Sequence, residues 1–172
     1  MKVTIIEVAT NKDIDALIRE GIFKEMPSIH QNWNFNFNKH VRKLNSSGFV
    51  LVTDNNPNVI EGCLIFEMIE KAIPSIAYLE IAPHNRKPQK RYENIAGCLI
   101  AYVFKLSLIK GKGDFKGLLF LDISEEKEED QQKLMRVYSQ KYNAKLYAGG
   151  TMVIMDEGGE ELIKRYLEPT EL

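Results

Sequence analysis

The alternation of apolar and polar residues along the chain predicts strands and helices that follow one another closely, with no linker rich in Pro, Gly or Ser between them. Strands are predicted at residues 2–9, 48–53, 59–69, 76–82, 117–123, 145–148 and 151–155. Helices are predicted at residues 14–22, after a cap at 11–13, and at residues 38–45, 94–110, 125–142 and 157–167.

The order of these elements is β-α-α-β-β-β-α-β-α-β-β-α, which predicts a mixed α/β fold with one mixed sheet. Residues 76–123 form a central βαβ unit, for which a right-handed crossover is expected. A length of 172 residues fits one domain, so we expect a single domain over residues 1–172.

Charge is balanced along the chain as a whole, with 23 Lys and Arg against 24 Asp and Glu and a formal net charge of −1. This balance argues against a nucleic-acid partner, because such proteins carry an excess of cations. The longest weakly charged run, residues 95–109, is too short to cross a membrane comfortably. The first residues lack a secretory signal, and Cys63 and Cys98 are expected to be buried thiols, so a cytoplasmic location is the default expectation.

Several chemical motifs are missing from the sequence. The histidines His30, His40 and His84 are scattered and match no metal-binding spacing, so no metal site is predicted. A G-x-S-x-G nucleophile and a Walker A loop are absent as well. The glycines at 111–117 run from helix to strand, which is the wrong order for a dinucleotide loop.

One loop concentrates positive charge at the start of a helix. Residues 83–92 carry Arg86, Lys87, Lys90 and Arg91 with no acidic residue, and they lead from a strand into the apolar helix at 94–110. Free backbone N–H groups and the positive helix end favour an anion there, and a phosphate or pyrophosphate suits both. The alternative is a solvated loop whose charges bind nothing.

The start of this helix carries a recognisable pattern. Arg91-Tyr92-Glu93-Asn94-Ile95-Ala96 resembles the acetyl-coenzyme A signature Q/R-x-x-G-x-G/A of the GNAT N-acetyltransferase superfamily, with Asn94 in place of the middle glycine. Asn tolerates a positive φ better than other non-glycine residues, so the replacement is physically acceptable. Residues 79–83 resemble the family's fourth strand, and residues 137–144 resemble its L-Y-x-K-x-G-F segment.

The resemblance implies that acetyl-CoA lies in a V-shaped gap between the family's fourth and fifth strands. Backbone groups of Leu79 and Ile81 would pair with the pantetheine arm. The pyrophosphate would lie on the N–H groups of Arg91, Tyr92, Glu93, Asn94, Ile95, Ala96 and Gly97. Arg86, Lys87 and Lys90 would reach the adenosine phosphates.

The resemblance also implies direct acyl transfer, which needs a base for the amine and an acid for the leaving thiolate. Glu80 is the candidate base, and the alternative is that it pairs with a cation such as Arg86. Tyr138 is the candidate acid. Two alternatives are that Ser139 occupies this slot and that Tyr138 only packs on the sheet.

The implied activity is transfer of an acetyl group from acetyl-CoA to the primary amine of a small-molecule or peptide acceptor. Residues 32–38, which alternate Asn with aromatics, fall where the family borders its acceptor pocket, although these aromatics also suit simple packing. An inactive CoA-binding module is one alternative function. A protein-interaction module is another, with a homodimer surface on the final hairpin and last helix.

Overall fold

The computed structural model describes residues 1–168 of the chain. One nine-stranded mixed sheet runs through it in the order β6-β1-β2-β3-β4-β5-β7-β9-β8. The strands are β1 (Lys2–Glu7), β2 (Lys12–Glu20), β3 (Ser46–Thr53), β4 (Asn56–Ile69), β5 (Ile73–Ile81), β6 (Tyr92–Glu93), β7 (Leu119–Asp122), β8 (Lys145–Ala148) and β9 (Thr151–Ile154). Neighbours pair antiparallel except for β5 and β7, which are parallel.

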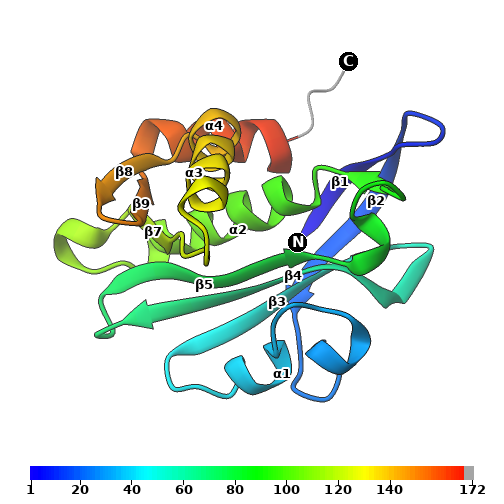
Figure 1. Ribbon diagram of the computed structural model, residues 1–172, viewed down its shortest axis with the longest axis horizontal. Coiled ribbons are helices and arrows are strands. Elements are labelled where there is room, and N and C mark those ends of the chain that lie inside the picture. Colours follow the sequence, from blue (N-terminus) through cyan, green and yellow to red (C-terminus); the bar gives the residue numbers. More distant parts are fainter. Residues whose placement is uncertain (169–172) are drawn as a thin grey trace.

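The helices cover the two faces of this sheet unequally (Figure 1). The helices α2 (Ile95–Lys110), α3 (Glu128–Tyr142) and α4 (Asp156–Leu167) lie on one face, and the short α1 (Phe37–His40) lies on the other. Single 3-10 turns occur at η1 (Ile29–Gln31), η2 (Pro83–Asn85) and η3 (Gly113–Phe115). No helix within residues 1–168 is long and apolar enough to span a membrane.

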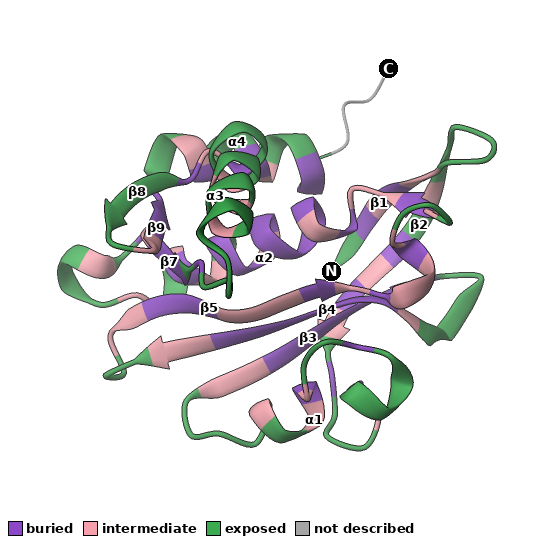
Figure 2. Ribbon diagram, in the orientation of Figure 1, coloured by how far each residue is buried: buried purple, intermediate pink, exposed green. Residues whose placement is uncertain are grey.

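Each face of the sheet has its own apolar core (Figure 2). The larger core is packed by α2 and α4, and α2 is buried on most of its sides, as its continuous apolar pattern predicts. The smaller core forms around Trp33 and Phe37, beneath the segment that connects β2 to β3. Because β5 contributes to both cores, its two faces look toward different surroundings.

The predicted central βαβ unit is confirmed. The β5 strand leads through η2 and β6 into α2, and α2 returns to β7, which pairs with β5 in parallel. The predicted hairpin around 54–58 is confirmed as β3–β4, and the one at Gly149–Gly150 as β8–β9.

The helix predicted at 14–22 is wrong, because residues 12–20 form the strand β2. Ile14, Ala16 and Ile18 turn one face of β2 toward the larger core, and the chain reaches β2 through a hairpin in which Asn11 has a φ of 52°. The helix predicted at 38–45 is also shorter than expected, because α1 has only four residues. The predicted order β-α-α is therefore β-β-α at the start of the chain.

Candidate functional site

Within residues 1–168, β5 and β7 are the only parallel pair of strands, and they separate after two residue pairs. Ser75 pairs with Phe120 and Ile76 with Leu121, although β5 continues to Ile81. Ala77 has no partner on β4, because Ile65 pairs with Tyr78 and Phe66 pairs with Ile76. Such a bulge bends a strand and increases its twist, so it favours divergence from the neighbouring strand.

A cavity of about 100 Å³ lies where β5 and β7 diverge. Leu79 lines it from β5 and Tyr138 from α3. This is the gap in which the resemblance places the cofactor, and the part of β5 that borders it keeps β4 on its other side.

The N-terminus of α2 borders a second cavity of about 110 Å³. Its lining contains many of the predicted cofactor residues: Ile81, Lys90, Tyr92, Glu93, Asn94, Ile95 and Ala96. Asn94 has a φ of 70°, the left-handed conformation that a glycine adopts easily. The first intrahelical bond runs from the N–H of Cys98 to the carbonyl of Asn94, so three earlier amides, at residues 95–97, point out of the helix end. That end of α2 is therefore a suitable place for an anion.

The residues before Asn94 do not belong to this helix end. Tyr92 and Glu93 form the strand β6, which pairs with Ile6 and Glu7 of β1. The N–H of Tyr92 donates to the Oδ1 of Asn85 at 3.2 Å, so it is not available to a pyrophosphate. Of the N–H groups predicted to contact the pyrophosphate, that of Tyr92 is therefore already used, whereas those that follow Glu93 at the start of α2 remain candidates.

The cations of the loop do not all face the helix end. Arg86 forms an ion pair with Glu80, and Lys90 pairs with Glu93 at 2.6 Å. The Arg91 guanidinium lies 5.1 Å from the centre of the Tyr92 ring. Arg86 is therefore engaged away from the place where the resemblance expected it to meet phosphates.

Lys141 of α3 lines the cavity at the α2 N-terminus, a position that was not predicted from the sequence. Its charge helps to lower the pKa of Glu93, although the hydrogen bond from Lys90 is the larger cause. A signal was present in the sequence, since Lys141 occupies the Lys position of the L-Y-x-K-x-G-F resemblance.

Glu80 lies on the α1 side of the sheet with only 7% of its surface exposed. Its two carboxylate oxygens accept hydrogen bonds from the backbone N–H of Asn34 at 2.9 and 3.0 Å, and Arg86 donates to one of them. Burial raises the pKa of Glu80, while the Asn34 bond and the Arg86 charge act against this shift. The alternative that Glu80 pairs with Arg86 is thus observed.

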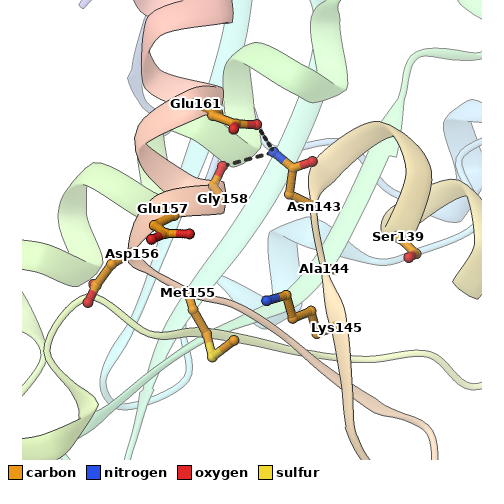
Figure 3. Close-up of a pocket in the computed structure, with 9 residues that line it drawn as sticks. All are labelled: Ser139, Asn143, Ala144, Lys145, Met155, Asp156, Glu157, Gly158 and Glu161. Atoms are coloured by element: carbon orange, nitrogen blue, oxygen red, sulfur yellow. Dashed lines mark hydrogen bonds between the residues drawn. The ribbon is translucent and has the colours of Figure 1, made fainter.

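The candidate acids Tyr138 and Ser139 face different cavities. Tyr138 lines the gap between β5 and β7, and burial raises its pKa to about 12. Ser139 lines another cavity of about 440 Å³ between α3 and the start of α4, shown in Figure 3. The carboxylates of Asp156, Glu157 and Glu161 line that cavity too, and their charge would oppose an anionic cofactor.

The aromatic residues at 32–38 divide between core and site. Trp33 and Phe37 are buried in the smaller core, which agrees with simple packing. Phe35 instead lines the gap and lies 5.0 Å from Tyr78 between ring centres. One aromatic residue of the segment therefore borders the gap on the side where Glu80 lies.

No family model matches the chain, and no curated protein matches its sequence. Solved structures do match its fold. A mutant form of the spermidine/spermine N-acetyltransferase SpeG from Vibrio cholerae superposes with a TM-score of 0.54 at 14% identity, over 87% of this chain and 97% of that one. Ard1 from Thermoplasma volcanium gives a TM-score of 0.55 at 13% identity, over 80% and 94% of the two chains.

A third match is a GNAT family acetyltransferase from Elizabethkingia anophelis with acetyl-CoA bound. It has a TM-score of 0.50 at 11% identity, over 82% of this chain and 98% of that one. This chain has the GNAT fold. At these identities the likeness shows the fold alone and assigns no activity to this chain.

Proposed function

We propose that this protein is an acetyl-CoA-dependent N-acetyltransferase that acetylates a primary amine. The observation that carries the proposal is the combination of the gap between β5 and β7 with the free amides of α2 beside Ile81. A pantetheine arm would pair with the unpartnered edge of β5, and the pyrophosphate would accept bonds from the amides of residues 95–97. Lys90 and Lys141 outnumber Glu93, to which Lys90 is paired, in the lining of the same cavity, so the lining is net positive.

The reaction needs a proton to leave the amine and another to reach the thiolate. In this proposal Glu80 takes the first proton, directly or through a water, and the amine nitrogen attacks the thioester carbonyl. Backbone N–H groups near Ile81 stabilise the oxyanion that forms. The C–S bond then breaks, and the nitrogen loses its remaining extra proton to water as the amide forms. Tyr138 protonates the thiolate and regains a proton from solvent.

The proposed function is tested first by binding. A ligand at about 100 times its Kd stabilises a protein by about 2.7 kcal/mol, which for a domain of this size raises Tm by about 5–10 °C. We expect acetyl-CoA to raise Tm by this amount and ADP, which lacks the pantetheine arm, to raise it less. If millimolar acetyl-CoA leaves Tm unchanged, the proposal is wrong.

Catalysis is tested by release of free coenzyme A from acetyl-CoA across a panel of primary amines. A thiol reagent measures this release with little background from the protein, because its two thiols, Cys63 and Cys98, are both fully buried. The engagement of Glu80 by Arg86 favours a second candidate, a CoA-binding module without transferase activity. A chain that binds acetyl-CoA and releases no thiol with any amine would support that module.

A further inference from the structure

Glu61 of β4 is a buried carboxylate that the proposed reaction does not use. Only 1% of its surface is exposed. Its Oε2 is 2.5 Å from the Nε2 of His84 and accepts a hydrogen bond from the Nδ2 of Asn85 at 2.7 Å. A buried carboxylate costs free energy unless its oxygens are paired, and here both partners come from η2 at the end of β5.

Both polar groups of the Asn85 side chain form hydrogen bonds, and these bonds connect β4 with β6. Its Nδ2 donates to the carboxylate of Glu61 and, at 3.2 Å, to the backbone carbonyl of the same residue. Its Oδ1 accepts the N–H of Tyr92 at 3.2 Å. With 1% of its surface exposed, Asn85 is a buried bridge from β4 to β6.

This bridge ends two residues before Asn94. From Tyr92 the chain passes through Glu93, turns at the left-handed Asn94 and begins α2. Tyr92, which is also paired with Glu7 of β1, therefore helps to place the start of α2 and its free amides at residues 95–97. The intervening residues 86–91 are more exposed, and their ion pairs, Arg86 with Glu80 and Lys90 with Glu93, are only partly buried.

We propose that Glu61 and Asn85 are positioning residues of the cofactor site. They hold the loop of residues 83–92 so that the α2 amides face the gap before the cofactor arrives. Amides fixed in advance bind a pyrophosphate without an ordering cost at the moment of binding. The proposal rests on the proposed function, because it assigns these residues to the cofactor that this function requires.

The test compares Asn85→Ala with a matched control, Ser107→Ala. Ser107 is also fully buried and donates to the Phe104 carbonyl from within α2, and none of its hydrogen bonds reaches the loop. Loss of one hydrogen bond of this kind corresponds to about a tenfold change in affinity. We expect Asn85→Ala to weaken coenzyme A binding, measured by calorimetry, about tenfold, and Ser107→Ala to leave the affinity unchanged. Equal affinities for Asn85→Ala and wild type would overturn the proposal, as would an equal loss in the control.

A second measurement reads the loop directly. Hydrogen–deuterium exchange of the unliganded protein should be faster over residues 86–97 in Asn85→Ala, and unchanged over residues 100–110. Glu61→Gln keeps one oxygen that can accept from Asn85, so it should retain more coenzyme A affinity than Glu61→Ala. If the two Glu61 variants bind equally well, Glu61 does not act through Asn85.

The two proposals fail in different ways. If the wild-type chain does not bind coenzyme A, the proposed function is wrong, and the exchange measurement still decides whether Glu61 and Asn85 hold the loop. If the wild type binds coenzyme A and Asn85→Ala binds it equally, only the positioning role is wrong.

Discussion

Glu80 combines features that oppose one another. Burial raises its pKa, which makes a carboxylate a better proton acceptor near neutral pH, whereas Asn34 and Arg86 stabilise its ionised form. Strand alternation predicts that Glu80 shares a face with Tyr78 and Ala82. These two residues belong to the smaller core, and the bond of Glu80 to Asn34 agrees with that face. Strand alternation predicts a face, but it does not predict that the amide of Asn34, 46 residues away, lies against the carboxylate.

We predict that the pH dependence of kcat reports Glu80. Only ionised Glu80 can accept a proton, and its raised pKa moves the acid limb of the profile above that of an exposed glutamate. The rate should rise with pH through this limb, and Glu80→Gln should remove the limb and lower kcat about a hundredfold. A variant with normal turnover and an unchanged profile would exclude Glu80 as the base.

Stability gives a separate reading of the same group. Because the folded-state pKa of Glu80 is raised, its protonated form favours folding at low pH, and this contribution is lost as pH rises through the raised pKa. Chemical denaturation from pH 4 to 7 should therefore show wild type losing stability relative to Glu80→Gln as the pH increases. The opposite trend would mean that the bonds from Asn34 and Arg86 outweigh burial.

Tyr138 keeps its proton at neutral pH, although burial makes it a weaker acid than an exposed tyrosine. With a pKa of about 12 its hydroxyl stays protonated at neutral pH, next to the gap in which the thiolate would form. Tyr138→Phe should lower kcat about a hundredfold with little change in acetyl-CoA affinity. Ser139→Ala is the matched control, because Ser139 faces the other cavity, and it should retain full activity.

Among the elements, the start of α2 was the most predictable. Asn in place of the signature's middle Gly is acceptable where φ is positive, and the observed φ of 70° at Asn94 fits this interpretation. The strand β2 was not predicted, since Ile14, Leu17, Ile18 and Ile22 match a helical spacing while Ile14, Ala16 and Ile18 match a strand. Pairing with β1 and β3 decides between the two patterns, and sequence periodicity contains no information about that pairing.

The left-handed turn at Asn94 has a measurable cost for other residues. Asn94→Ala should destabilise the protein by about 1–2 kcal/mol, because Ala has the unfavourable Cβ without the short polar side chain that makes this conformation accessible to Asn. Asn94→Gly should keep stability near that of wild type and retain acetyl-CoA binding. Urea denaturation and calorimetry measure the two effects. Equal stability of Asn94→Ala and Asn94→Gly would contradict this account.

The helices α2 and α4 approach each other through glycines. A Cβ at Gly159 of α4 would overlap the ring of Phe104, and a Cβ at Gly97 of α2 would overlap the ring of Tyr166. Gly159→Ala should therefore destabilise the protein by about 1–3 kcal/mol, as overpacking of a core does. Since Gly159 lies away from the gap, coenzyme A affinity measured below Tm should be unchanged. An affinity loss would mean that α4 controls the position of the α2 amides.

At the scale of the whole molecule, the sheet is held together by few backbone pairs where β5 meets β7. Only two residue pairs connect β5 with β7, while β3 and β4 pair along most of their length. The α2 helix contacts both β5 and β7, and α4 packs on α2. Because β5 and β7 share so few backbone pairs, their packing against α2 is needed to hold them together.

This arrangement predicts how the molecule unfolds. Because the larger core includes residues from β1 through α4, we expect one cooperative transition in calorimetry over the whole chain. A cofactor in the gap would contact β5, α2 and α3 together, so acetyl-CoA should move the entire transition upward without splitting it. Two transitions, of which acetyl-CoA moves only one, would instead show that β7, β8 and β9 with α3 form a separate unit. In that case the join between β5 and β7 would be a boundary between domains, and the expectation of a single domain over residues 1–172 would be wrong.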